Sequence, residues 1–396
     1  MTSLAELKTR ALAAIDTHRD QLVTLSASLH AHPEIAFQEF QSAKLLCATL
    51  EQNVFAITRG VGTLETAFRA ECAGNRAGAT IAFLAEYDAL PDIGHACGHN
   101  LIAGAAIGAA IGARAVMEHL PGRVIVIGTP GEEGGGGKII LVNNRVFDDV
   151  DAALIVHPSG RTIIGRGSLA STRLNLEFSG RAAHAAAAPD DGINALEAVI
   201  LTFNNVNALR LHLRADARVH GIITNGGSAA NIIPDFASAQ FSVRAATQKY
   251  ADEILRRVIA CAQAAGIATC AQLKYATKPG YAEMISNPTL ARLFADNWRA
   301  INVPIDELRA NERMGSTDTG NVSQVVPALH PYIAIGPEGI PGHTIEFRDA
   351  AISDAGHAGM LNAAKGMALT AIDLLSNPGL VQQAKQEFAN KKPGRS

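Results

Sequence analysis

A cysteine and two histidines lie close together in the segment GHACGHN, residues 94–100. The segment comes directly after the apolar-acidic run IAFLAEYDALP, so Cys97 and His99 follow a stretch with the character of a buried strand. Thiolate and imidazole groups are ligands that suit Zn²⁺ and its late first-row neighbours. The segment is therefore either a metal site or a polar loop whose composition misleads.

Further potential ligands follow other apolar runs of the chain. Glu132 and Glu133 follow VIVIGTP, His157 ends ALIVH, and His343 follows YIAIG within a loop rich in Gly and Pro. In open α/β sheets, ligands bind outside the carboxyl ends of the strands, so we expect these groups to converge. Each alone has a structural interpretation, as a core histidine, a solvated loop charge or an inert thiol. Their joint placement favours a metal site.

The residue types indicate which chemistry such a site would perform. One thiolate, three imidazoles and one carboxylate are more ligands than a single tetrahedral catalytic ion uses while it keeps a water. Two ions with one bridging ligand are therefore expected. The adjacent pair Glu132 and Glu133 allows one carboxylate to hold metal while the other takes a proton from water. The predicted reaction is hydrolysis of a carbonyl-type bond.

The composition excludes several other classes of protein. The chain has 396 residues and a net charge of -3, without a long basic run, which argues against nucleic acid or an anionic membrane as the main partner. The segment at 101–113 is too short to span a bilayer, and residues 1–20 lack the apolar core of a signal peptide. Five loosely spaced cysteines predict no disulfide framework, and we expect a cytoplasmic protein.

The hydrophobic patterns predict two domains. Residues 1–169 and 283–396 alternate buried strands with helices, which indicates an α/β domain with a mostly parallel sheet. Residues 170–282 follow the order β-α-β-β-α-β of a ferredoxin-like unit, inserted into the first domain. Asn100 is expected to cap a helix over 100–120, and the polar tail at 385–396 is expected to fray.

The segment GEEGGGGK at residues 131–138 superficially resembles a phosphate-binding loop. Glu132 stands where that motif needs Gly, and Ile139 stands where it needs Ser or Thr. Two carboxylates would also repel a phosphate. We therefore do not predict a nucleotide site, and Lys138 has no assigned role at this point.

Several motifs in order along the chain resemble the M20 metallopeptidase and amidohydrolase family. Within it they are most similar to the branch that contains aminoacylase-1-like protein 2 and p-aminobenzoyl-glutamate hydrolase. The motifs are AEYDALPDIGHACGHN, GTPGEEGGGGK, VHPSG, GRAAHAAAAPDDGINALEA, NIIPD and PGHTIEF, and they span roughly residues 80 to 360. The resemblance implies a zinc-peptidase-like catalytic domain and a smaller lid domain through which the protein forms a homodimer.

The resemblance also implies roles for individual residues. Cys97 would bridge two metal ions, and Glu132 would be the general base that passes a proton to the leaving nitrogen. Asp88 matches an aspartate that orients a metal ligand. The remaining metal ligands would be His99, Glu133, His157 and His343. Glu86 stands where many members have a histidine ligand, a place that His99 would take here, so the role of Glu86 stays open.

Residues of the inserted domain match positions that contact substrate in the family. His184 in GRAAHA resembles a histidine that crosses the dimer interface to hold the oxyanion in the partner's site. Asn231 in NIIPD and Arg244 in SVRA resemble residues that bind the carboxylate of the substrate. A guanidinium group matches a carboxylate in geometry, whereas an arginine at a strand end is also a common solvated charge. Asp318 in GSTDTGN is left unassigned.

The leading hypothesis is a dinuclear metal-dependent amidohydrolase. It would cleave N-acyl amino acids or dipeptides with a free carboxylate, as aminoacylases, dipeptidases and carboxypeptidases do. Zn²⁺ is the preferred ion, and Mn²⁺, Co²⁺ or Ni²⁺ could occupy the same ligands. The alternatives are a non-catalytic partner subunit of a heteromeric hydrolase and a metal-dependent hydrolase of another fold.

Overall fold

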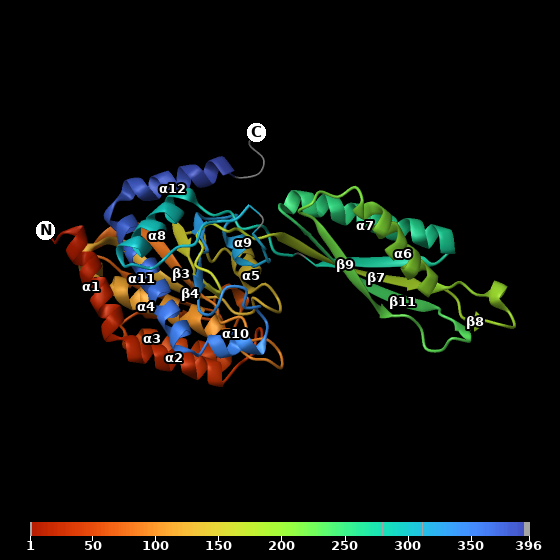
Figure 1. The fold of residues 1–396 in the computed structure, drawn as a ribbon, viewed down its shortest axis with the longest axis horizontal. Coiled ribbons are helices and arrows are strands. Elements are labelled where there is room, and N and C mark those ends of the chain that lie inside the picture. The colour runs from red at the N-terminus through yellow and green to blue at the C-terminus, as the bar shows by residue number, and fades with distance from the viewer. Residues whose placement is uncertain (1, 279, 311, 392–396) are drawn as a thin grey trace. The chain divides into compact units, whose positions relative to one another are not determined.

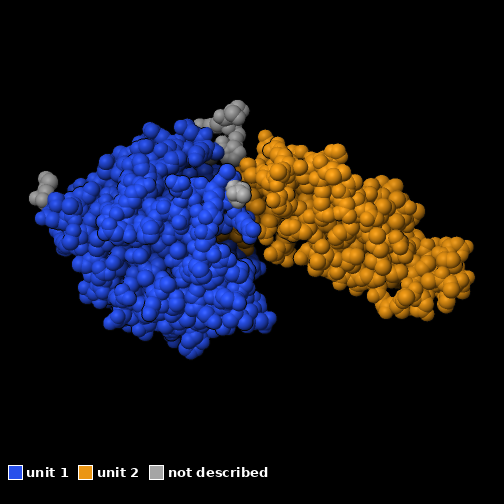
Figure 2. All heavy atoms as spheres, in the orientation of Figure 1, with its two compact units in different colours: residues 1–167, 284–314, 318–396 blue, residues 168–283, 315–317 orange. Residues whose placement is uncertain are grey.

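A computed structural model describes residues 2–278, 280–310 and 312–391 (Figure 1). The chain forms two compact units, shown in different colours in Figure 2. Unit 1 contains residues 1–167, 284–314 and 318–396, and unit 2 contains residues 168–283 and 315–317. Residues 315–317, which the sequence analysis assigned to the first domain, thus group with the inserted one.

Unit 1 is built on a six-stranded sheet with the strand order β1-β2-β4-β3-β5-β13. Strands β3, β4, β5 and β13 run parallel, whereas β1 and β2 form an antiparallel edge. A separate parallel pair, β6 with β14, continues from the ends of β5 and β13. The strands are β1 (Ala56–Arg59), β2 (Phe68–Ala73), β3 (Arg76–Ala85), β4 (Pro121–Gly128), β5 (Ala152–Leu154), β6 (His157–Ser159), β13 (Ala328–Leu329) and β14 (Tyr332–Ala334).

The central strands are apolar because helices cover the sheet. Residues 81–85 of β3 and 124–127 of β4 are all buried, as expected for strands in a parallel sheet. The helices of unit 1 are α1 (Leu4–Thr17), α2 (Arg19–Ala31), α3 (Phe40–Gln52), α4 (His99–Arg114), α5 (Gly137–Asn143), α8 (Pro288–Ala300), α9 (Thr319–Val322), α10 (Ile345–Ala350), α11 (Asp354–Ser376) and α12 (Pro378–Lys391). The predicted α/β class is confirmed.

Helix α4 is almost entirely buried and places His99 at its first position. Small residues let other helices approach it closely: a Cβ atom at Gly104 would lie 2.3 Å from Met360 of α11. Asn100 is not the N-cap as predicted, because the helix begins one residue earlier after Gly98 in the left-handed region. The Asn100 amide instead donates to Ser26 Oγ and the Ala351 carbonyl, which tie α4 to its neighbours.

The expectation of a frayed tail is wrong for residues 385–391, which lie in α12. Thr289 at the start of α8 donates to the Glu387 carboxylate through both its N–H and its hydroxyl. Residues 392–396 lie outside the described part. Within the described residues, every helix is too short or too polar to serve as a membrane span.

Unit 2 is an antiparallel four-stranded sheet with two helices, in the chain order β-α-β-β-α-β that the sequence predicted. Its elements are β7 (Ala170–Ser179), α6 (Ala195–Arg210), β9 (Arg218–Asn225), β11 (Phe236–Ala245), α7 (Gln248–Thr269) and β12 (Gln272–Lys278), and the strand order is β12-β7-β11-β9. Alternate residues such as Leu174, Leu176 and Phe241 are buried in the core that contains α6 and α7. A short ribbon pairs β8 (Ala183–His184) with β10 (Ile232–Ile233).

Candidate metal centre

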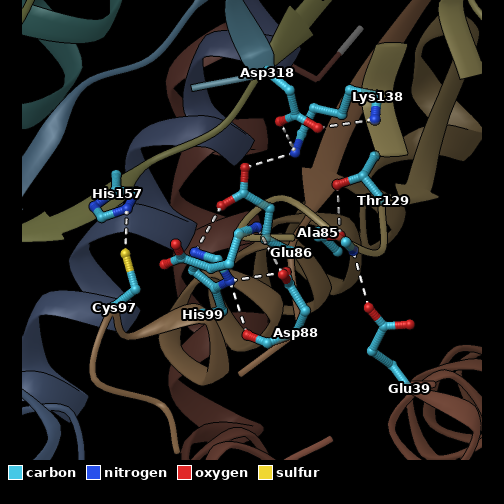
Figure 3. Close-up of polar contacts among 12 residues, drawn as sticks. Glu39, Ala85, Glu86, Asp88, Cys97, His99, Thr129, Lys138, His157 and Asp318 are labelled. Atoms are coloured by element: carbon cyan, nitrogen blue, oxygen red, sulfur yellow. Dashed lines mark hydrogen bonds and ion pairs between the residues drawn. The ribbon is translucent and has the colours of Figure 1, made fainter. Parts of the chain in front are cut away.

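The chain leaves strand β3 through a buried acidic segment. Tyr87 donates its hydroxyl to the Thr66 carbonyl at 2.7 Å, which fixes the segment between Glu86 and Asp88. Glu86 and Asp88 are each 1 % exposed. The His99 Nδ1 atom lies 2.9 Å from the Asp88 carbonyl oxygen and 3.0 Å from Asp88 Oδ1. Strand β3 and helix α4 therefore hold one imidazole in a fixed orientation (Figure 3).

The end of strand β4 carries the acidic pair. Thr129 donates to the Ala85 carbonyl, and the Gly131 N–H donates to Glu39 Oε1 at 2.9 Å. Gly131 has a φ of 71°, and a side chain there would meet the Phe37 ring at 2.7 Å, so the turn requires glycine. The Glu133 N–H donates to Asp88 Oδ2 at 2.9 Å. These bonds attach the loop that carries Glu132 and Glu133 to the end of β3.

Two more histidines come from the neighbouring strand pair. His157 is the first residue of β6, and its Nε2 atom lies 3.4 Å from Cys97 Sγ. His343 lies in the loop after β14 with a φ of 62°, and its N–H donates to the Ala96 carbonyl at 3.0 Å. The His343 Nε2 atom lies 3.2 Å from Glu133 Oε1.

The structure thus brings together all the side chains that were predicted as metal ligands. They form three overlapping groups, within each of which the potential ligand atoms lie no more than 4.8 Å apart. The groups are Cys97, His99 and His157; Cys97, Glu133 and His343; and His99, Glu132 and Glu133. His95, the other histidine of the GHACGHN segment, belongs to none of these groups and stacks on His30 instead, with ring centroids 6.3 Å apart.

The hydrogen bonds at the two most buried imidazoles suit metal binding. His99 Nδ1 faces two oxygens of Asp88, and His157 Nδ1 lies 2.6 Å from the Pro158 carbonyl oxygen, so each Nδ1 carries the proton. The lone pair of Nε2 is then free in both rings. Within the described residues, His99 Nε2 is buried without a hydrogen bond. Metal-binding histidines in proteins are typically oriented in this way.

The electrostatics of the cluster also suit a cation. Burial lowers the pKa of His157 to about 4, so its ring is neutral and able to ligate. Burial raises the pKa of the Cys97 thiol above its ordinary value, so its thiolate needs a positive neighbour. Burial raises the pKa of Glu132 well above its usual range, and the charges of Glu86 and Asp318 raise it further. A cation among these groups would offset both effects.

A buried ion triad, which the sequence analysis missed, lies next to the cluster. Lys138 Nζ lies 2.7 Å from Glu86 Oε1 and 2.7 Å from Asp318 Oδ1 (Figure 3). The open question about Glu86 is thereby answered in structural terms, because its carboxylate pairs with a lysine. The available signal was Lys138 itself, a charged residue directly before the apolar run IILV.

The residues predicted to contact substrate all lie in unit 2. His184 is exposed at the end of β8, where it pairs with Ile232 of β10, and the Ala185 N–H donates to the Asn231 carbonyl at 3.0 Å. The ribbon thus brings His184 and Asn231 close together. Arg244 lies on β11 directly opposite Arg218 of β9. It alternates with the buried Val243 and Ala245, so it projects from the sheet face away from the helical core.

Comparisons with known proteins place this fold and site. A family model described as the peptidase dimerisation domain (M20_dimer) matches residues 165–270. The chain is 38 % identical to the Xaa-Arg dipeptidase of Mus musculus over 97 % of this chain and 93 % of that protein. The chain belongs to the M20 peptidase family. It is also 31 % identical to one of the two p-aminobenzoyl-glutamate hydrolase polypeptides of Escherichia coli, over 94 % of this chain and 93 % of that one.

Solved structures agree on the fold of this M20 protein. One is the YXEP protein of Bacillus subtilis, a dinuclear metal-binding peptidase from the M20 family, with a TM-score of 0.72 and 20 % identity over 91 % of this chain and 99 % of that one. The predicted family, fold class and enzyme class are therefore confirmed. The protein is an M20-type hydrolase that acts on amide or peptide C–N bonds.

Proposed function

We propose that this M20 protein is a dinuclear metal-dependent amidohydrolase that cleaves N-acyl amino acids or dipeptides with a free carboxylate. The convergence of ligands from separate strand ends within 4.8 Å of one another, with Glu132 among them, carries this proposal. The names of its relatives support the substrate class, since Xaa-Arg dipeptides and p-aminobenzoyl-glutamate both join a carboxylate-bearing amino acid through an amide.

The ligand set fits two divalent ions. We assign the ligands to Cys97, His99, Glu133, His157 and His343. The mixture of sulfur, nitrogen and oxygen favours Zn²⁺, with Mn²⁺, Co²⁺ and Ni²⁺ as alternatives. When bound, such ions polarise a carbonyl and make water a stronger acid. Asp88 would keep the His99 ring oriented through the contacts at Nδ1.

Glu132 is assigned as the general base. It would take a proton from the attacking water, whose oxygen adds to the amide carbon, and then give that proton to the leaving nitrogen as the C–N bond breaks. Its buried environment favours the protonated carboxyl, which suits the second of these steps. The other carboxylate of the pair, Glu133, is committed to Asp88 through its N–H and to His343 through its side chain.

Residues of unit 2 would bind the rest of the substrate. We assign Arg244 and Asn231 to the substrate carboxylate, and His184 to the carbonyl oxygen in the site of the other protomer. Arg244 and Arg218 give one face of the sheet a positive character that suits a carboxylate. The match to a peptidase dimerisation domain over 165–270 supports a homodimer that forms through this unit. The cytoplasmic location stays a prediction.

A second candidate function is that of a non-catalytic partner in a heteromeric hydrolase. The observation that favours it is the similarity to p-aminobenzoyl-glutamate hydrolase, which consists of named subunits. The complete set of metal ligands together with Glu132 favours catalysis, because a chain without activity has no need to retain them.

The decisive experiment is a Glu132→Gln variant of protein loaded with each metal in turn. The assays are hydrolysis of N-acyl amino acids, of dipeptides with different C-terminal residues, including Arg, and of p-aminobenzoyl-glutamate. We expect the wild type to cleave one of these classes and the variant to lose about 10²- to 10⁴-fold in kcat while its metal content is unchanged. Glu118→Gln, at a carboxylate whose side chain is 67 % exposed, is the matched control. Full activity of Glu132→Gln would refute the assignment of the base, and an inactive wild type would favour the second candidate function.

A further inference from the structure

The ion triad of Glu86, Lys138 and Asp318 is the most deeply buried charged group that the proposed reaction does not use. The side chains of Lys138 and Asp318 are 0 % exposed, and that of Glu86 is 1 % exposed. Asp318 also accepts the backbone N–H of Lys138 at 2.9 Å. Both carboxylates are thereby committed to one residue near the start of helix α5.

Stability alone is a poor explanation for such a triad. Removing three charges from water is costly, and apolar residues of similar volume often replace buried ion pairs without loss of stability. The surroundings of unit 1 are apolar and would accept them, since Leu141 on the same helix is fully buried. Charge is instead retained at a place that borders the metal centre.

The triad contacts the metal centre through Glu86. One oxygen, Oε1, is held by Lys138, while the other, Oε2, lies 3.4 Å from His99 Nε2. That nitrogen is the atom through which His99 would ligate a metal. The direction of the Glu86 carboxylate beside His99 is therefore fixed by Lys138 rather than by the metal ligands.

The triad also anchors the segment that carries the acidic pair. Lys138 is the second residue of α5, which follows the glycine-rich turn after Glu132 and Glu133. Asp318 precedes helix α9 but makes no cap to it, because its carboxylate is bound to the side chain and the N–H of Lys138. The start of α5 is thus pinned from the side opposite to the acidic pair along the chain.

We propose that Lys138 is a positioning residue of the metal centre: it orients Glu86 beside His99 and, through Asp318, fixes the start of α5 behind Glu132 and Glu133. This inference rests on the proposed function only for its effect on turnover. Its effect on metal binding follows from the geometry of the ligands alone.

The test uses the full-length protein and a Lys138→Met variant, which keeps the length of the side chain and removes its charge. We expect the equilibrium affinity for Zn²⁺, measured with a competing chelator, to fall about 10- to 100-fold, as for other residues that orient metal ligands. We expect kcat to fall at least about tenfold at saturating metal, with KM within about threefold, since the substrate-binding residues of unit 2 are untouched.

Two further variants separate positioning from stability. Lys8→Met removes the partner of Asp373 in unit 1, a partly buried ion pair with an N–O distance of 2.6 Å away from the metal ligands. It should lower the melting temperature and leave metal affinity and kcat unchanged. The neutral triple variant Glu86→Gln, Lys138→Met, Asp318→Asn leaves no unpaired charge, so it should recover the melting temperature but not the metal affinity or kcat.

The inference is overturned if the neutral triple variant has wild-type metal affinity and kcat, or if Lys138→Met changes only the melting temperature, as Lys8→Met should. A failure of the proposed function gives a different result. In that case the wild type hydrolyses no amide, while the difference in Zn²⁺ affinity between wild type and Lys138→Met is still measured.

Discussion

Glu39 shows how a single residue supports the catalytic loop from outside the ligand set. Its side chain is fully buried and accepts hydrogen bonds from the N–H groups of Phe37 and Gly131 and from the Thr66 hydroxyl. Gly131 directly precedes the acidic pair, so Glu39 sets the path of that loop. Burial raises the pKa of Glu39 to about 7, and the Asp88 charge contributes.

This raised pKa gives a prediction about stability. The folded protein binds the proton of Glu39 more tightly than the unfolded chain does, so stability is lost as the pH rises from about 4.5 to about 7. Glu39→Gln cannot titrate and keeps an oxygen for the two N–H groups. We expect the free energy of unfolding of the variant, relative to wild type, to rise by on the order of 3 kcal/mol across this window.

Urea unfolding of both proteins at about pH 5 and about pH 8 measures this difference. Groups that titrate equally in both proteins cancel in the comparison. A difference between the two proteins that stays constant with pH would show that Glu39 is already ionised in the folded state at about pH 5.

Residues that contact partners nearby in the chain, or that follow strands, could be predicted from the sequence. Cys97, His99, Glu133, His157 and His343 were found because the carboxyl ends of parallel strands meet at one edge of a sheet. Lys138 was missed because its partner Asp318 is 180 residues away, and no local pattern connects them. Glu39 was missed for the same reason, since its contact with Gly131 spans 92 residues.

At the scale of elements, β9 is the strand whose surroundings suggest a partner. It lies at the edge of the four-stranded sheet and pairs within the described residues only with β11. Ile222 and Ile223 on this strand are 62 % and 44 % exposed. Exposed apolar edge strands readily pair with another chain. We therefore place the proposed dimer contact at β9.

A double variant tests this contact. Ile222→Lys with Ile223→Lys would bring like charges together across a symmetric interface, so we expect the dimer dissociation constant to rise at least about 100-fold. Analytical ultracentrifugation gives this constant directly. Leu308→Lys, at a leucine of unit 1 that is 51 % exposed, is the control and should stay dimeric. A double variant that dimerises like the wild type would move the interface away from β9.

Elements with strong periodicity were predicted well, and errors lie where distant contacts decide. The strands of unit 2 and helix α4 were found from their patterns, but the capping role of Asn100 was wrong because Ser26 and Ala351 bind its amide. Helix α12 was missed since it has few apolar residues. Its place is set by contacts with α8, such as the bonds from Thr289 to Glu387.

At the scale of the whole molecule, the two units have separate hydrophobic cores. The core of unit 2 is formed entirely by residues between 170 and 273, and that of unit 1 by residues before and after this insertion. Gly167 and Met284, where the chain leaves and re-enters unit 1, lie side by side: a Cβ atom at Gly167 would be 3.8 Å from the Met284 carbonyl oxygen. A short linker can therefore replace the insertion.

Replacing residues 168–283 by a Gly-Ser linker separates metal binding from turnover. All the proposed ligands and Glu132 stay in the shortened protein, which we expect to fold and to retain its metal. Without Arg244, Asn231 and His184 it should lose at least about 10³-fold in kcat/KM, since orientation of the substrate contributes a large part of catalysis. It should also be monomeric, while residues 168–283 produced alone should fold and dimerise. Thermal unfolding, elemental analysis and ultracentrifugation give these results, and a shortened enzyme with full activity would exclude unit 2 from substrate binding.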